Sequence, residues 1–222
     1  MISFKGIQLE NNDFSFRPTL ITEACAEVVN FKDKKILDLG CGIGPLAIYF
    51  ALNGAKEVTA SDIYDEHLNL TLVNAKKNDA NIKIIQSDLF REISEEYDVI
   101  SCDVSGVEKK IAEVTGWFPD GVPKADDTGA NLIIKVIQDS LNYLVKDGEL
   151  FICATSFSDI VEIEKTMEVN YKNSWERVYC EEVPFSKRLK RNLDLLSFND
   201  YIIEKDGSFF WQIFIYKLKK VS

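Results

Sequence analysis

Three glycines at alternate positions, directly after an apolar strand pattern, carry the clearest chemical signal in this chain. Gly40, Gly42 and Gly44 follow the apolar run of residues 36–39, and a helix pattern begins at Pro45. Glycine lets the main chain approach a ligand closely and adopt dihedral angles that other residues avoid. The amino terminus of the following helix adds backbone N–H groups that lack partners within the helix. This arrangement predicts that a nucleoside-bearing ligand lies against bare backbone.

A dinucleotide would be bound by the same physics, so the two kinds of ligand must be distinguished. The dinucleotide fingerprint has a third glycine three residues after the second, where helix and strand pack tightly. Pro45 stands at that position. The sequence therefore disfavours pyrophosphate binding.

The stretch from Asp38 to Gly44, Asp-Leu-Gly-Cys-Gly-Ile-Gly, resembles motif I of the class I S-adenosylmethionine-dependent methyltransferases. The resemblance continues through a strand pattern ending at Asp62, a Ser-Asp-Leu-Phe segment at residues 87–90, and a fourth strand pattern that runs into Asp103. It implies S-adenosylmethionine as the cofactor. The cofactor contacts that it implies are Asp38, Gly40, Cys41, Gly42, Gly44, Asp62, Ile63, Asp88, Leu89 and Asp103.

The resemblance also implies what two of the downstream acids do. Asp62 is expected to accept hydrogen bonds from both ribose hydroxyls, as the acid after the second strand does in this architecture. Asp88 is expected to face the adenine amino group, and Leu89 the adenine ring. Taken singly, each acid would also fit a helix N-cap or a solvated loop. Their spacing behind the glycines favours the cofactor.

Asp103 is the candidate catalytic residue. A sulfonium makes its methyl carbon electrophilic, so the protein must chiefly align a nucleophile and remove water from it. A carboxylate at the end of the fourth strand could orient an amine, accept its proton or stabilise the sulfonium, and it could also simply cap the next turn. The only histidine, His67, is expected on the exposed side of its helix and is disfavoured as a general base.

The resemblance is nearest to the branch that contains the release-factor glutamine and ribosomal-protein methyltransferases, and it covers roughly residues 16–154. Glutamine-modifying members end the fourth strand with Asn-Pro-Pro-Tyr, which grips a planar amide. Here Asp-Val-Ser-Gly stands at residues 103–106 instead. An acid at this place suits an acceptor with a positive or protonated amine, which it could hold by ion pairing.

The expected acceptor contacts are Arg17, Ser105, Trp117 and Phe118. Arg17 lies in a stretch that loosely resembles the Pro-Arg-Pro-x-Thr-Glu segment of that branch. It could reach a carboxylate of substrate or cofactor, or be an exposed side chain of a surface loop. Thr19 and Thr22 could cap the next helix. The aromatic pair lies in residues 107–127, where a long loop is typical of a lid.

Three hypotheses about the activity follow. In the first, a methyl group moves to a small-molecule amine, an amino acid or a protein side chain. In the second, attack on another carbon beside the sulfur gives aminocarboxypropyl transfer, or ring closure of the cofactor with release of methylthioadenosine. In the third, the chain is a noncatalytic nucleotide-binding protein of the same fold, or a nucleotide-binding dehydrogenase.

The composition of the chain indicates which partners and which cellular location to expect. A net charge of −10 disfavours nonspecific nucleic-acid binding, although residues 187–191 form a local basic run. Five cysteines without a Cys-x-x-Cys pair suggest reduced, mostly buried thiols. We see no signal-peptide pattern and no apolar run of membrane-spanning length, so a cytoplasmic protein without membrane contact is expected. No metal site is predicted, and the sequence does not indicate an oligomeric state.

The strand and helix patterns alternate, which is typical of an α/β domain. The resemblance implies a Rossmann-like, mostly parallel sheet of seven strands in the order 3-2-1-4-5-7-6, with helices on both faces. We expect one domain over residues 1–222, with residues 1–30 as a cap or lid and residues 107–127 and 184–208 as substrate-side insertions. The late elements are expected at 128–145 (helix capped by Asp127 and Thr128), 149–154 (strand), 158–170 (helix), 175–183 (strand) and 200–217 (hairpin).

Overall fold

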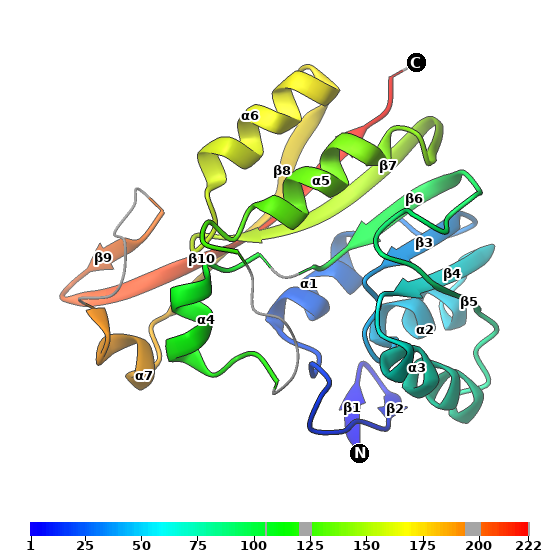
Figure 1. The fold of residues 1–222 in the computed structure, drawn as a ribbon, viewed down its shortest axis with the longest axis horizontal. Helices are drawn as coiled ribbons and strands as arrows, with labels where there is room; N and C mark the ends of the chain where they lie inside the picture. Colours follow the sequence, from blue (N-terminus) through cyan, green and yellow to red (C-terminus); the bar gives the residue numbers. More distant parts are fainter. Residues whose placement is uncertain (105, 120–125, 194–200, 222) are drawn as a thin grey trace.

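A mixed β-sheet forms the centre of the computed structural model, which describes residues 1–104, 106–119, 126–193 and 201–221 (Figure 1). Within these residues the strands lie in the order β5-β4-β3-β6-β7-β10-β8, and β9 pairs with β10. The strands are β3 (Lys35–Leu39), β4 (Glu57–Asp62), β5 (Lys83–Gln86), β6 (Tyr97–Cys102), β7 (Leu144–Thr155), β8 (Trp175–Pro184), β9 (Ile203–Lys205) and β10 (Ser208–Lys219). β3 to β7 are parallel, and β10 is antiparallel to both its neighbours. The predicted order 3-2-1-4-5-7-6 is confirmed.

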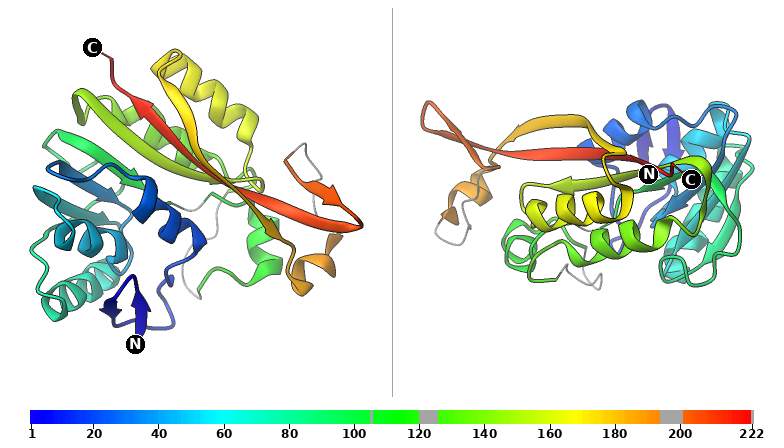
Figure 2. Two further views of the ribbon diagram at one scale, coloured as in Figure 1. Left: turned by 180° about the vertical axis from the view of Figure 1, so that it is seen from behind. Right: turned by 90° about the horizontal axis from the view of Figure 1, so that it is seen from above.

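Helices cover both faces of the sheet. They are α1 (Leu20–Val28), α2 (Pro45–Leu52), α3 (Asp65–Lys77), α4 (Lys109–Thr115), α5 (Asn131–Ser140), α6 (Ile160–Tyr171) and α7 (Lys187–Lys190). The first three bury their apolar faces in one core, and α5 and α6 lie side by side over the other (Figure 2). Neighbouring residues of β3 divide between the two cores, Ile36 in one and Leu37 in the other, which explains the unbroken apolar run of this strand.

A small hairpin of β1 (Ile2–Phe4) and β2 (Ile7–Leu9) precedes the sheet and packs against α2 and α3. At the other end of the chain, β8 and β10 extend past the sheet and carry α7 and β9 as an arm (Figure 2). Leu189 fixes α7 to a third core cluster, and this helix contacts α4. The arm therefore lies beside the segment that follows β6.

The predicted helix over residues 128–145 was wrong in its extent. It ends at Ser140 as α5, and β7 begins at Leu144, because Leu144 pairs with Tyr97 of β6 and is fully buried there. The expected cap was right in part. Thr128 Oγ1 accepts from Ala130 N at 3.2 Å, whereas Asp126, not Asp127, accepts from Asn131 N, the first helical N–H, also at 3.2 Å.

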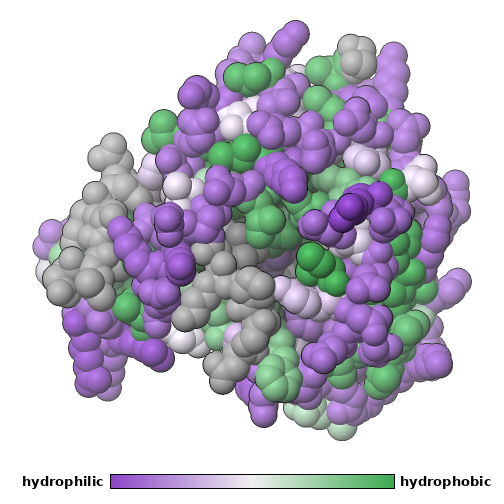
Figure 3. Space-filling model, in the orientation of Figure 1, coloured by the Kyte–Doolittle hydropathy of each residue, from purple (hydrophilic) through white to green (hydrophobic). Residues whose placement is uncertain are grey.

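The two expected insertions are only partly described. A short helix, α4, occupies part of residues 107–127 where a loop was expected, and it ends at Gly116 in the left-handed conformation. Residues 120–125 and 194–200 lie outside the described residues. Hydrophilic side chains predominate on the face shown in Figure 3. No helix within the described ranges is both long and apolar enough to cross a membrane.

Candidate active site

The glycine turn lies at the carboxyl end of β3, and two of its glycines serve different purposes. Gly44 has φ +86°, and a Cβ there would lie 2.8 Å from Thr71 Cγ2 of α3, so this glycine allows close packing within the protein. Gly42 has φ +54° and meets nothing within 4 Å. Open space beside bare backbone at Gly42 fits the close approach of a ligand.

The surroundings of the two glycines predict that alanine substitutions at Gly44 and Gly42 differ in their effect on stability. Gly44→Ala should lower the free energy of unfolding by about 2–3 kcal/mol, because φ strain and a collision with Thr71 combine. Gly42→Ala should cost only about 1 kcal/mol from φ strain, yet it should weaken cofactor binding because its methyl group fills the open space. Urea denaturation and calorimetric titration measure the two effects. Equal stability losses would contradict the packing role of Gly44.

The backbone N–H groups of the turn are already used within the protein. Gly40 N and Cys41 N donate to Ser61 O at 2.8 and 2.9 Å. Gly42 N donates to Asp62 Oδ2 at 2.9 Å. These bonds couple the glycine turn to the end of β4, so the turn and Asp62 form one unit.

Asp38 accepts a hydrogen bond from a further backbone N–H group, at the start of α2. Its Oδ2 accepts from Ala47 N, in the first turn of α2, at 3.0 Å, and Pro45 has no N–H to offer. The expectation that this helix terminus supplies unpartnered N–H groups was therefore wrong for these positions. An anion cradle needs several such groups, so the geometry also argues against a pyrophosphate ligand. Asp38 is buried, which raises its pKa to about 7 despite the Ala47 bond.

Asp103 follows β6 directly and lies on the same face of the sheet as Asp38. Asp38 pairs with Ser101 across β3 and β6, and Asp103 stands two residues later. Burial raises the pKa of Asp103 to about 6, while a hydrogen bond from Thr22 Oγ1 at 3.3 Å opposes the shift. Thr22 also caps α1 together with Thr19, as predicted. The sequence did not predict its contact with Asp103.

Neither of these acids, Asp38 or Asp103, has a cationic partner in an ion pair within the described residues. Ser101 Oγ is buried without a hydrogen-bond partner among these residues. Two carboxylates whose charges no protein cation balances favour a cationic ligand.

Asp62 is fixed from two sides at the carboxyl end of β4. Its Oδ1 accepts from Tyr64 N at 2.9 Å and lies 3.2 Å from His67 Nδ1, while Oδ2 is bound by the glycine turn. His67 is buried, so its expected place on the exposed side of the helix was wrong. Its imidazole is held by two polar acceptors, a contact that spacing within the helix alone did not indicate.

The expected adenine residues lie at the next strand end. Asp88 is exposed, Leu89 is half-buried with φ +51°, and Ile63 is 49% exposed. Asp62 pairs with Gln86 across β4 and β5, so these residues follow the same sheet edge. Gln86 Nε2 also donates to Ile63 O at 3.2 Å. The structure thus brings the expected ribose and adenine contacts to one end of the sheet.

The residues that were expected to contact the acceptor differ in their surroundings. Trp117 packs against Trp211 of β10 with ring centroids 5.3 Å apart, so it belongs to an aromatic cluster as well as to the surface. Phe118 meets Phe16 edge-on at 5.3 Å, which joins the segment after β6 to the amino-terminal segment. Arg17 is exposed. Ser105 lies outside the described residues.

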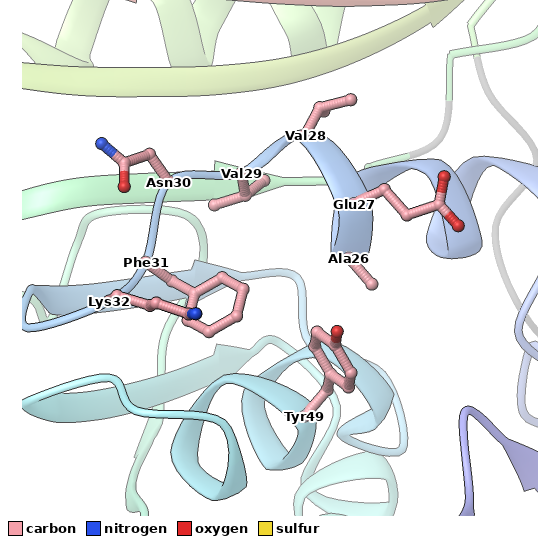
Figure 4. Close-up of a pocket in the computed structure, with 8 residues that line it drawn as sticks. All are labelled: Ala26, Glu27, Val28, Val29, Asn30, Phe31, Lys32 and Tyr49. Atoms are coloured by element: carbon pink, nitrogen blue, oxygen red, sulfur yellow. The ribbon is translucent and has the colours of Figure 1, made fainter.

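A separate groove lies away from these residues. Figure 4 shows it between the end of α1 and Tyr49 of α2, lined by residues 26–32. Residues 31 and 32 precede β3, so the groove is near the amino end of that strand, whereas the glycine turn follows its carboxyl end. Ligands of open α/β sheets bind beyond the carboxyl ends of the strands, which favours the glycine side.

Comparison with known proteins decides the family. The methyltransferase small domain family model matches residues 20–103, which contain Asp38, the glycine turn, Asp62, Asp88 and Asp103. The release factor glutamine methyltransferase of Lactococcus lactis is 31% identical over 67% of this chain and 59% of its own length. The chain belongs to the class I S-adenosylmethionine-dependent methyltransferases.

Further comparisons agree with this family. The release factor glutamine methyltransferase of Streptococcus pneumoniae is 26% identical over 92% of this chain and 72% of its own. The crystal structure of a ribosomal protein L11 methylase from Lactobacillus delbrueckii has a TM-score of 0.57 and 18% identity, over 90% of this chain and 77% of that one. At 18% identity, the similarity to the L11 methylase structure shows the fold alone. The chain spans 59% of the Lactococcus relative's length, and the cofactor of the family is S-adenosylmethionine.

Proposed function

We propose that this protein transfers the methyl group of S-adenosylmethionine to an amine, carried by a small molecule, an amino acid or a protein side chain. The observation that carries the proposal is the half-buried Asp103 carboxylate at the end of β6. Its pKa of about 6 keeps it largely ionised near neutral pH. An ionised carboxylate can hold an amine by a charge-assisted hydrogen bond and take up its proton.

The other residues support the cofactor in this proposal. Asp62 would accept from the ribose hydroxyls, Asp88 from the adenine amino group, and Gly42 would lie against the ligand. Asp38 and Asp103 would face the positive charges of the ammonium and sulfonium groups. When bound, the cofactor supplies an electrophilic methyl group. The protein aligns the acceptor and removes water from it.

The acceptor side of the proposed site is aromatic. Trp117, Phe118 and Phe16 would exclude water from the acceptor, and Arg17 and Ser105 would contact it. Relatives named as release factor and ribosomal protein methyltransferases favour a protein acceptor among the alternatives. Nucleic acid is a weaker candidate because the chain carries a net charge of −10. We also propose that the chain acts as one domain, in the cytoplasm.

Product analysis tests the reaction. The purified chain, incubated with labelled S-adenosylmethionine and a panel of amines, amino acids and peptides, should release S-adenosylhomocysteine together with a methylated amine. Methylthioadenosine as the product would instead support aminocarboxypropyl transfer or ring closure. Cofactor binding without turnover of any acceptor would favour a noncatalytic protein.

The pKa of Asp103 predicts a pH dependence. Because the carboxylate form is required, kcat/KM for the acceptor should rise about tenfold for each pH unit below the pKa of the ligand-free protein and level off above about pH 7. The raised pKa has the opposite effect on stability: the folded, ligand-free protein favours the protonated acid, so Asp103 destabilises it as pH rises from about 4 to above 6. A pH profile of kcat/KM and thermal melts measure both trends. A kcat/KM that is constant from pH 5 to 8 would contradict the role.

A further inference from the structure

The one histidine of the chain is held between two hydrogen-bond acceptors. His67 Nδ1 lies 3.2 Å from Asp62 Oδ1, and Nε2 lies 3.1 Å from the backbone oxygen of Phe14. Neither acceptor has a hydrogen to donate while the carboxylate is ionised. A neutral imidazole donates from only one ring nitrogen, whereas the imidazolium donates from both. Only the imidazolium form satisfies both contacts.

The surroundings of the ring favour this charged form. The Asp62 carboxylate raises the pKa of His67 above its ordinary value, burial lowers it, and the Phe14 carbonyl and Glu66 act with Asp62. The charged and titratable groups that face the ring in the described residues are Asp62 from β4, Glu66 from α3, and Tyr64, whose ring stands edge-on at 5.1 Å. The amino-terminal segment contributes the Phe14 carbonyl.

His67 is also one of three side chains by which α3 holds the backbone of the amino-terminal segment. Asn74 bonds Glu10 N and O at 2.6 and 3.1 Å. Asn78, at the end of the helix, bonds Gln8 N and O at 3.1 and 2.8 Å. Spacings of seven and four residues place the three side chains on one helix face. The two amides do not titrate, so only the contact nearest Asp62 depends on pH.

The segment at Phe14 is a turn that is held together by its own hydrogen bonds. Phe14 N donates to Asn12 Oδ1 at 3.0 Å, and Ser15 Oγ bonds both Asn12 N and Asn12 O at 3.2 Å. Ser15 is buried. Because the turn is fixed internally, the bond from His67 to the Phe14 carbonyl positions residues 12–15 as a whole beside Asp62.

We propose that His67, as the imidazolium, is a positioning residue for S-adenosylmethionine: it orients the Asp62 carboxylate and holds residues 12–15 beside the adenosine site. This inference rests on the proposed function in that Asp62 binds the ribose. When pH rises through the pKa of His67, the ring keeps one donor and loses the other. Either the carboxylate or the turn is then released, and affinity for the cofactor falls.

The protonation state is measured directly because the chain has a single imidazole. Protein labelled with ¹⁵N-histidine should show both ring nitrogens protonated at pH 7 and a pKa above the ordinary value of about 6.5. One unprotonated ring nitrogen at pH 7 would overturn the proposal. This measurement needs no cofactor, so it tests whether His67 is an imidazolium even if the proposed function fails.

Calorimetric titration with S-adenosylmethionine from about pH 6 to 9 tests the consequence. Affinity should fall about tenfold at the alkaline end, the loss expected for one hydrogen bond to a charged group. His67→Asn retains a donor near Nδ1 and His67→Gln one near Nε2, and both should remove this pH dependence. Asn78→Ala loosens the same segment without a titrating group, so it should keep the native pH dependence.

Three further outcomes of the titration are distinguishable. Ionisation of Asp38 or Asp103 would strengthen binding of a cation with rising pH, the opposite direction. A native-like alkaline fall in His67→Asn and His67→Gln would overturn the positioning role while leaving the proposed function intact. Absence of cofactor binding at every pH would instead count against the proposed function.

Discussion

Asp103→Asn should lower kcat by at least about 100-fold, the loss expected when a group that accepts a proton in the reaction is removed. Asparagine keeps the size of the side chain but cannot carry the charge or take up a proton. Affinity for S-adenosylmethionine should change much less, because Asp62, Asp88 and the glycine turn remain. Steady-state kinetics and calorimetry with the same preparation separate the two quantities.

Stability and a neighbouring variant serve as controls for Asp103→Asn. The variant should melt a few degrees higher than the native chain at pH 8 without ligand, because it removes a half-buried charge that no cation balances. Thr22→Val removes the hydrogen bond to Asp103 and the bond that Thr22 Oγ1 accepts from Thr19 N in the α1 cap, but it leaves the carboxylate in place, so kcat should fall far less. Native kcat in Asp103→Asn would show that Asp103 merely caps the turn after β6.

Asp62→Ala should weaken S-adenosylmethionine binding by about 10- to 100-fold, because a ribose hydrogen bond to a charged acceptor is lost. The loss has a second source. Gly42 N, Tyr64 N and His67 all contact this carboxylate, so the glycine turn and the start of α3 lose their shared acceptor. Calorimetric titration at pH 7 measures the effect.

Asp65 provides a matched acid for comparison. It lies three residues further on, in the first turn of α3, and its side chain bonds only Asn69 of the same helix within the described residues. Asp65→Ala should therefore bind S-adenosylmethionine as the native chain does. Unchanged affinity in Asp62→Ala would contradict its role as the ribose acceptor, and equal losses in both variants would point to a general effect of charge.

The sheet was predictable because its signals are local and repeated. The apolar run that ends at Gly40 and the strand patterns that end at Asp62 and Asp103 each predict a parallel strand that leads into a loop. Parallel strands bring such loops to one edge, so the site's acids could be placed together. The family resemblance added the strand order, which periodicity alone does not give.

The remaining features depend on contacts between distant parts of the chain. The burial of His67 is fixed by the Phe14 carbonyl, 53 residues away in sequence. The contact of Thr22 with Asp103 spans 81 residues. A helix pattern shows neither partner. The early start of β7 has the same cause, because pairing of Leu144 with Tyr97 outweighs the local helix signal.

A crystal structure of the protein with S-adenosylhomocysteine tests the central claim most directly. We predict the ribose hydroxyls on Asp62, the adenine between Ile63 and Leu89, and the sulfur beside Asp103. Density for the ligand in the groove at Tyr49, or a glycine turn that the ligand does not touch, would contradict the account.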